Sequence, residues 1–213
     1  MRPSLGISGF AKLTTVSRET LERLGRYVDL LTAWNRRINL VGRGTIGDVW
    51  RRHILDSAQL YPLIPTRAQT LVDLGSGAGL PGLILAIMGV PEVHLVESDT
   101  RKVVFLREAL RVTGTNATIH ATRIDRVAPF TADIITARGL TSLEELIEMS
   151  QPFRGPKTIS LFLKGRTVEE ELTDTVKMWN MRIDRQPSLT DDSGSILRLE
   201  APHDPGSRVD HNL

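Results

Sequence analysis

The stretch DLGSGAGLPG, Asp73 to Gly82, contains four glycines whose spacing fits two different cofactor-binding loops. From Gly77 it reads G-x-G-x-x-G, the spacing of dinucleotide-binding loops. From Asp73 it reads D-x-G-x-G-x-G, with Gly75, Gly77 and Gly79, a spacing typical of loops that bind S-adenosylmethionine. Both spacings let backbone N–H groups approach an adenosine ligand, so neighbouring residues have to distinguish the two classes.

Strands and helices alternate around this loop. Apolar runs predict five strands, at 70–75, 93–98, 117–122, 133–138 and 157–165. Helical spacings predict four helices, at 82–88, 100–114, 142–153 and 168–179. This order predicts an α/β fold with a mostly parallel sheet and helices on both faces. The segments 181–189 and 195–201 predict a final antiparallel strand pair, which is typical of Rossmann-like class I methyltransferases and unusual in dinucleotide-binding folds.

Asp73 favours the methyltransferase interpretation. In a dinucleotide-binding loop, small apolar strand residues would precede Gly77, whereas this chain has Gly75 and Ser76. A carboxylate here would repel a pyrophosphate but suit S-adenosylmethionine, which carries an ammonium and a sulfonium charge. Glu97 follows Gly77 by twenty residues and suits the ribose hydroxyls of either cofactor. We therefore expect S-adenosylmethionine, with an NAD-dependent oxidoreductase as the alternative.

Ligands of open parallel sheets bind at the carboxyl ends of the strands. Five residues with suitable chemistry end or follow the predicted strands: Gly75, Glu97, Asp125, Arg138 and Lys164. We expect Arg138 to contact the cofactor carboxylate or the substrate, because a charge at this edge of the sheet is well placed for either.

The N-terminal third of the 213-residue chain is basic. Residues 1–67 carry eleven Lys or Arg and five Asp or Glu, a net charge of +6, whereas residues 68–213 have a net charge of −4. This asymmetry is typical of proteins that bind an anionic macromolecule. An arginine-rich helical face exposed to water has the same composition, so the charge leaves both interpretations open.

Two helices are predicted in the basic region. Ser17 is a suitable N-cap, and apolar residues three and four apart predict a helix to about Trp34, which we expect in the core. A second helix is predicted from Ile46 to Tyr61. We thus predict three parts: a basic helical cap over 1–67, a cofactor-binding methyltransferase domain over 68–202 and a flexible tail over 203–213.

The composition excludes several kinds of chemistry. The chain has no cysteine, which rules out disulfides, thiolate metal sites and a cysteine nucleophile, and no metal is expected. Neither a signal peptide nor a membrane span is predicted, so we expect a cytoplasmic protein. Methylation at C5 of a pyrimidine usually needs a cysteine. The loop ARGLTS (137–142) lacks the Asn/Asp-Pro-Pro-aromatic motif that methylates exocyclic amines.

Methyl transfer to N7 of guanine is one reaction that is compatible with these absences. N7 carries a free lone pair at neutral pH, so the reaction needs orientation and desolvation but no general base. We accordingly predict no catalytic acid or base.

Seven short motifs recur together in one family: WNRRINLVG (34–42), RRHILDS (51–57), DLGSGAGLPGLILA (73–86), ESDTRKVVFL (97–106), RID (123–125), ITARGL (135–140) and LFLKGR (161–166). Through them the chain resembles the 16S ribosomal RNA guanine-N7 methyltransferase family from about Tyr27 to Lys164. The glycine block alone marks only the superfamily. Its combination with RHILDS and RKVVFL is much more specific.

The resemblance implies transfer of a methyl group from S-adenosylmethionine to N7 of guanine 527, in the usual 16S numbering. The partner would be 16S rRNA or the small ribosomal subunit, and a monomer is favoured. The cofactor contacts implied by the resemblance fall on Gly75, Leu80, Ile124, Asp125 and Arg138, where the family more often has Ala or Val followed by Glu at 124–125.

The basic residues that we expect to bind RNA phosphates are Arg36, Arg37, Arg51, Arg52, Lys164 and Arg166. A surface arginine without a specific role is the alternative for each residue of the cap. His53 is expected to pair with Asp56 or with a backbone group. A methyltransferase of another RNA or of a small molecule, and a non-catalytic RNA-binding module, remain alternatives for the whole chain.

Overall fold

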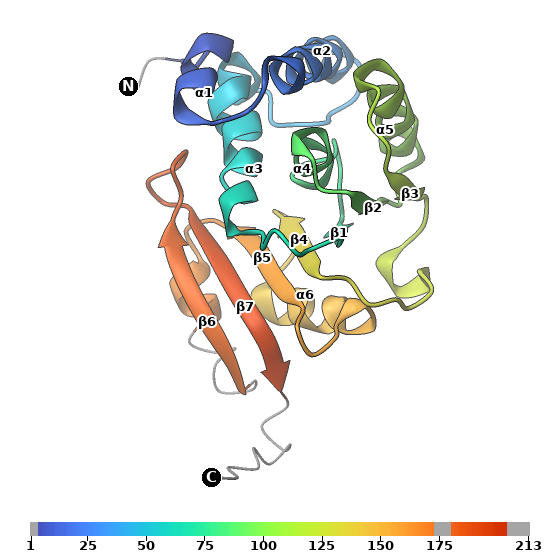
Figure 1. Cartoon of the computed structure of the whole chain (residues 1–213), viewed down its shortest axis with the longest axis vertical. Helices are drawn as coiled ribbons and strands as arrows, with labels where there is room; N and C mark the ends of the chain where they lie inside the picture. The colour runs from blue at the N-terminus through green and yellow to red at the C-terminus, as the bar shows by residue number, and fades with distance from the viewer. Residues whose placement is uncertain (1–3, 173–179, 204–213) are drawn as a thin grey trace.

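The computed structural model describes residues 4–172 and 180–203. Seven strands form one sheet in the order β3-β2-β1-β4-β5-β7-β6 (Figure 1). β1 to β5 run parallel to one another, and β7 is antiparallel to both β5 and β6. This confirms the predicted α/β fold and its antiparallel C-terminal pair. The strands are β1 (Thr70–Leu74), β2 (Glu92–Val96), β3 (Thr118–His120), β4 (Ile134–Arg138), β5 (Ile159–Lys164), β6 (Asn180–Pro187) and β7 (Ser195–His203).

The strand order fixes where a ligand can bind. β1 lies between β2 and β4, so the chain connections turn away from each other at the carboxyl ends of β1 and β4. A crevice forms at such a switch point. The glycine-rich loop directly follows β1, so it lies at this crevice.

Helices cover both faces of the sheet, because alternate strand residues point to opposite sides. In β1, Leu71 belongs to the hydrophobic cluster under α4 (Gly82–Met88) and α5 (Thr100–Thr113). Val72 belongs to the cluster under α6 (Leu143–Ser150). Gly114 ends α5 in the left-handed conformation, at the end of the helix predicted over 100–114.

The N-terminal helices pack onto the first of these clusters. α1 (Ile7–Leu13), which the sequence did not predict, buries Phe10 against the Trp50 ring at 5.5 Å. α2 (Arg18–Asn35) begins after Ser17, whose hydroxyl accepts from the N–H of Thr20, as expected of an N-cap.

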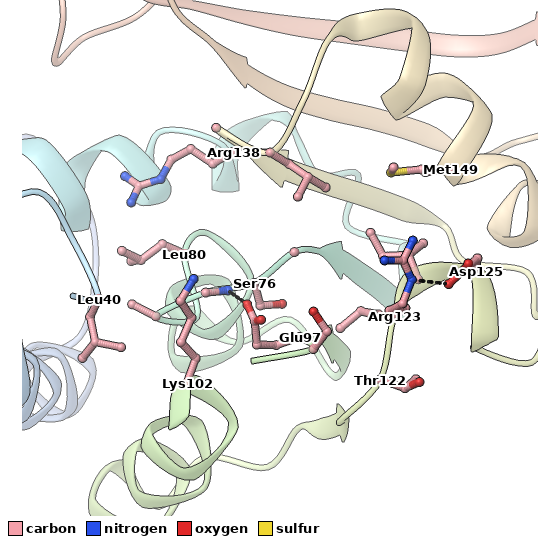
Figure 2. Close-up of a pocket in the computed structure, with 18 residues that line it drawn as sticks. Leu40, Ser76, Leu80, Glu97, Lys102, Thr122, Arg123, Asp125, Arg138 and Met149 are labelled. Atoms are coloured by element: carbon pink, nitrogen blue, oxygen red, sulfur yellow. Dashed lines mark hydrogen bonds and ion pairs between the residues drawn. The ribbon is translucent and has the colours of Figure 1, made fainter. Parts of the chain in front are cut away.

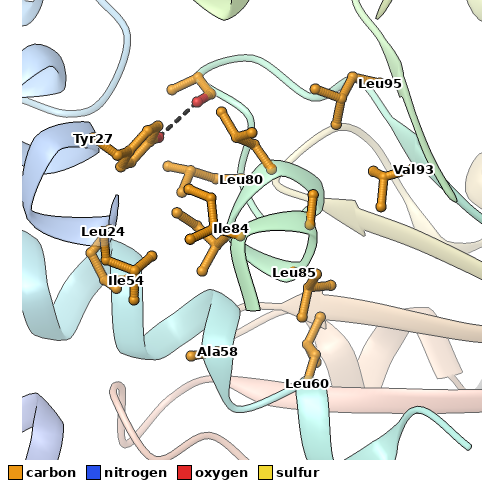
Figure 3. Packing of buried hydrophobic residues seen from close by; sticks show 14 of the residues in the cluster. Leu24, Tyr27, Ile54, Ala58, Leu60, Leu80, Ile84, Leu85, Val93 and Leu95 are labelled. Carbon is orange, nitrogen blue, oxygen red and sulfur yellow. Dashed lines mark hydrogen bonds between the residues drawn. The ribbon is translucent and has the colours of Figure 1, made fainter. Parts of the chain in front are cut away.

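One core joins the N-terminal region to the sheet. Tyr27 and Trp34 of α2 lie edge-on to Phe105 of α5, with ring centroids 6.1 and 5.7 Å apart. Leu24 and Ile54 pack with Ile84 of α4 in the same cluster (Figure 3). The predicted cap over 1–67 thus shares its hydrophobic core with the predicted methyltransferase domain.

The second N-terminal helix differs from the prediction of one α-helix over 46–61. It consists of a 3-10 turn, a π-helical segment (Trp50–Leu55), the short α3 (Asp56–Ala58) and another 3-10 turn. In the π-helical segment the N–H of Asp56 reaches the carbonyl of Arg51, five residues back. The carbonyl of Arg52 accepts from the side chain of Arg138, at 3.3 Å, so an interaction with β4 accompanies the wider turn.

Two predicted segments lie partly outside the residues that the structure describes. The predicted helix over 168–179 is helical at 168–172, and its remainder lies outside the described residues. The predicted tail, apart from His203 at the end of β7, lies outside them as well. Within residues 4–172 and 180–203, no helix is long and apolar enough to cross a bilayer.

Candidate cofactor and substrate site

The glycine-rich loop bends sharply over the end of β1. Gly75, Gly77 and Gly79 have φ angles of +66°, +56° and +84°, in the left-handed region that glycine adopts without strain. A Cβ on Gly75 would lie 2.7 Å from a methyl group of Leu140. The loop therefore needs glycine both for its backbone conformation and for close contact with the segment after β4.

This loop forms one wall of a cavity of about 440 Å³ at the carboxyl ends of β1, β2 and β4 (Figure 2). A cavity of this size suits a ligand as large as an adenosyl cofactor. It is lined by seven of the nine residues predicted to bind the cofactor: Gly75, Gly77, Leu80, Glu97, Ile124, Asp125 and Arg138.

Eleven other lining residues were not predicted, among them Leu40, Lys102, Leu140 and Met149. Leu40, Lys102 and Leu140 lie inside motifs that carry the family resemblance, so a signal was present for them. Met149 lies on α6 and had no comparable signal.

Glu97 connects the loop to the end of β2. Its side chain is buried, and its two carboxylate oxygens accept from the N–H groups of Gly77 at 2.8 Å and Asp99 at 2.7 Å. A carboxylate offers about four acceptor positions. Since Glu97 also lines the cavity, its remaining acceptor positions are available to ligand hydroxyl groups.

Asp73 does not line the cavity, contrary to the prediction that its charge faces the cofactor. Strand alternation turns it towards α4, where it is fully buried. It accepts from the Thr136 hydroxyl at 2.7 Å and from the Gly82 N–H at 3.2 Å. Burial raises the pKa of Asp73 to about 6. Asp73 therefore supports the loop from beneath.

The third glycine of the dinucleotide spacing also has a packing explanation. A Cβ on Gly82 would lie 2.6 Å from the Cβ of Asp73. Gly82 thus allows α4 to approach β1. Gly79 likewise packs on Leu83, 2.7 Å from where its Cβ would be, and does not line the cavity.

Tyr27 anchors the loop to the N-terminal region. Its hydroxyl donates to the carbonyl of Ala78 at 2.7 Å, and the side chain is fully buried. Burial raises the pKa of Tyr27, so the phenol remains a donor. This contact could not be predicted from the sequence, because Tyr27 follows the ordinary apolar spacing of α2.

Arg138 points its guanidinium group away from this cavity and towards the N-terminal helices (Figure 2). The group donates to Asp56 at 3.1 Å, to the Arg52 carbonyl at 3.3 Å and to Nδ1 of His53 at 3.2 Å. The predicted contact with the cofactor carboxylate is therefore not supported for the guanidinium group. The rest of the residue lines the cavity wall.

The prediction for His53 was a pairing with Asp56 or with a backbone group, whereas its side chain pairs with Thr45 and Arg138. Its Nδ1 accepts from Arg138, so its Nε2 donates to the Thr45 hydroxyl at 2.8 Å. The Thr45 hydroxyl in turn donates to the Gly42 carbonyl at 2.7 Å. Burial, followed by the charges of Arg138 and Arg52, lowers the pKa of His53 to about 3. His53 is therefore neutral in the folded protein at physiological pH.

The six predicted RNA-binding residues fall into two groups. Lys164 is nearly buried and pairs with Glu171 at 2.6 Å, so its ammonium group already has a partner within the protein. Arg51 pairs with Asp48, and Arg52 with Asp191. The other three are exposed, and within the described chain their side chains form no ion pair or hydrogen bond: Arg36, Arg37 and Arg166.

Known proteins share both the sequence and the fold. Residues 20–193 match the family model described as rRNA small subunit methyltransferase G. The Ribosomal RNA small subunit methyltransferase G of Paramagnetospirillum magneticum is 57% identical over 184 residues, which cover 86% of this chain and 90% of that protein. The protein of the same name from Rhodospirillum centenum is 53% identical over 197 residues, covering 92% and 91%.

The fold is also that of a solved methyltransferase. A TehB-like SAM-dependent methyltransferase from Corynebacterium glutamicum superposes on this chain with a TM-score of 0.53 at 14% identity. The superposition covers 70% of this chain and 87% of that one. At this identity the likeness shows the fold alone.

Proposed function

This chain belongs to the rRNA small subunit methyltransferase G family, and from that membership we propose that it methylates N7 of one guanine of 16S rRNA. As a member of the family it is an S-adenosylmethionine-dependent rRNA methyltransferase. The proposal adds the acceptor atom and the target, guanine 527, from the motifs described above.

The residues present fit the cofactor. We assign the loop from Gly75 to Leu80 to its methionine end, Glu97 to the ribose hydroxyls, and Ile124 with Asp125 to the adenine. The support is that these groups line one cavity and that Glu97 keeps acceptor positions after holding the loop. Asp73 and Gly79 are reassigned to shaping the loop. When bound, the cofactor supplies a methyl group on a positively charged sulfur.

The transfer is balanced without a proton. The N7 lone pair of guanine forms the new N–C bond, and the electron pair of the broken C–S bond returns to sulfur. The positive charge moves from the sulfur to the guanine ring, so no general base is needed. The protein's contribution is to orient the two reactants and to exclude water.

Exposed arginines are the part of the molecule best suited to RNA. Arg36 and Arg37 follow α2 and are free of protein partners within the described chain, so they can neutralise phosphates. We assign RNA binding to the basic N-terminal region and Arg166, with methyl transfer in the remainder of the chain. A cytoplasmic location follows from an rRNA substrate and is part of the same proposal.

The observation that carries the proposal is the cavity. Seven of the nine predicted cofactor residues line it, and one of its walls is the glycine loop with its left-handed backbone conformations. Purified protein should transfer tritium from labelled S-adenosylmethionine to small subunits or 16S RNA that lack the modification. Mapping should place the label on N7 of one guanine. Label on another atom, or on small molecules alone, would overturn the proposal.

A further inference from the structure

A second cavity adjoins the cofactor cavity. It has a volume of about 320 Å³, and its lining shares Arg138 and Gly139, at the end of β4, with the first. Methyl transfer requires the acceptor atom to approach the methyl carbon to about 3 Å. The acceptor must therefore occupy space that is continuous with the cofactor cavity.

The rim of this second cavity is an ion pair between two parts of the chain that are distant in sequence. Arg52, in the π-helical segment, donates through Nη1 to Oδ2 of Asp191 at 2.9 Å. Asp191 lies in the turn between β6 and β7, which sits beside the helical segment labelled α3 (Figure 1). Both side chains are 36% exposed, so water and ligands can reach the pair.

Asp191 is held in place but keeps acceptor capacity. Its Oδ1 accepts from the N–H and the hydroxyl of Ser193, at 2.9 and 2.7 Å. Among the residues that the structure describes, Arg52 is the only donor to its Oδ2. The carboxylate is therefore oriented by its own turn, with one oxygen open to a further donor.

The other carboxylate of the cavity is already occupied. Asp56 accepts from the Thr190 hydroxyl and from Gln59 through Oδ1, and from Arg138 through Oδ2. Its side chain is also less exposed than that of Asp191. Asp56 thus has a structural role, and the rim pair is the part of the cavity that can recognise a ligand.

We propose that this second cavity binds the target base and that the Arg52–Asp191 pair recognises its Watson–Crick edge as guanine. This inference rests on the proposed function. The free acceptor position of the Asp191 carboxylate accepts from the N2 amino group, and the Arg52 guanidinium donates to O6. N7 lies on the Hoogsteen edge of the base, next to O6. In this orientation it faces Arg138 and Gly139, the wall that both cavities share.

The pair discriminates between purines by its order of donor and acceptor. Guanine presents the O6 acceptor beside the N1–H and N2 donors, whereas adenine presents an amino donor beside the N1 acceptor. A guanidinium next to a carboxylate is complementary to the first arrangement and mismatched to the second. One well-placed bidentate contact discriminates between bases by about 1–3 kcal/mol.

The test combines a protein change with a change in the base. Small subunits are reconstituted with 16S RNA that carries guanine or inosine at the target position, because inosine lacks only the N2 amino group. Wild-type protein, Asp191→Asn and a control, Asp184→Asn on an exposed part of β6, are compared by kcat/KM for methyl transfer. Cofactor affinity is measured by calorimetry. The asparagine at 191 retains an oxygen for both Ser193 contacts, so the turn is preserved.

We expect Asp191→Asn to lower kcat/KM on guanine about 10- to 100-fold, with cofactor affinity unchanged and the control like wild type. Inosine should lower the wild-type rate strongly and the variant rate little. Equal inosine penalties in both proteins would overturn the subsite. If Asp191→Asn fails to fold, Arg52→Gln should show the same loss on guanine, and wild-type activity there would refute the inference.

The two proposals fail in different ways. If wild-type protein places no methyl group on N7 of the target guanine, the proposed function is wrong and the subsite falls with it. If wild-type protein methylates that guanine while Asp191→Asn and Arg52→Gln do so equally well, only the subsite is wrong. If the variants lose the same factor in kcat/KM with guanine and with inosine at the target position, the pair contacts a phosphate and not the base. That result would also overturn the subsite.

Discussion

Replacing His53 by glutamine should change how the stability of the protein depends on pH. Glutamine can accept from Arg138 and donate to Thr45 as the neutral imidazole does, but it cannot titrate. In the folded wild type, burial and the neighbouring arginines lower the pKa of His53 from 6.5 to about 3. The imidazole stays neutral in the fold and takes up a proton below about pH 6.5 only after unfolding.

A proton that binds only to the unfolded chain favours unfolding. Stability that depends on His53 is therefore present above pH 6.5 and is lost as the pH falls towards 3. From the two pKa values, the loss between pH 7 and pH 5 is about 2 kcal/mol. Asp73 acts in the opposite direction, because its pKa is raised from 3.8 to about 6. It adds about 1 kcal/mol over the same interval, so the two groups largely cancel in the wild type.

Urea unfolding at several pH values between 7 and 5 measures this balance. His53→Gln should gain about 2 kcal/mol relative to wild type on going from pH 7 to pH 5. Asp73→Asn should lose about 1 kcal/mol relative to wild type over the same interval. All other titrating groups are common to the proteins and cancel in the differences. Parallel curves for wild type and His53→Gln would show that His53 is not a buried neutral group, and the reasoning would fail.

Three further changes test other parts of the site. Tyr27→Phe removes the hydrogen bond to the loop, and calorimetry should show cofactor affinity reduced about 2- to 10-fold with the fold retained; unchanged affinity would contradict the anchoring role. Gly82→Ala places a methyl group 2.6 Å from the buried aspartate and should cost about 1–3 kcal/mol in urea unfolding, whereas Gly47→Ala, with no atom within 4 Å, should cost less than about 1 kcal/mol. Replacing Arg36 and Arg37 by alanine should reduce the slope of log affinity for RNA against log salt by up to about two; an unchanged slope would place the phosphate contacts elsewhere.

The sequence predicted those features that depend on local pattern. The strand and helix order, the N-cap at Ser17 and the end of α5 at Gly114 follow from spacing and from single residues. The cavity position follows from the rule that ligands bind at the carboxyl ends of strands. The antiparallel pair of β6 and β7 was equally visible, because its apolar segments flank a turn sequence.

Features that depend on long-range contacts could not be predicted in this way. The bond from Tyr27 to the loop joins residues 51 positions apart, and the bond from Arg138 to His53 joins residues 85 apart. The direction of Asp73 is a different case. Asp73 is two residues from Leu71 in β1 and therefore points to the same face of the sheet, towards α4. The strand pattern thus predicted its direction correctly, whereas the motif led to the wrong expectation that it faces the cofactor.

The arginines of the N-terminal region are chemically alike in sequence, but the structure separates their roles. Arg52 lies in the π-helical segment, where it pairs with Asp191 and its carbonyl binds Arg138. Arg36 and Arg37 have no such partners within the described chain. A side chain that must first leave an ion pair gains less from a phosphate than a free one. General attraction to RNA should therefore depend on the free arginines, while the paired arginine at the second cavity can contribute selectivity for the base.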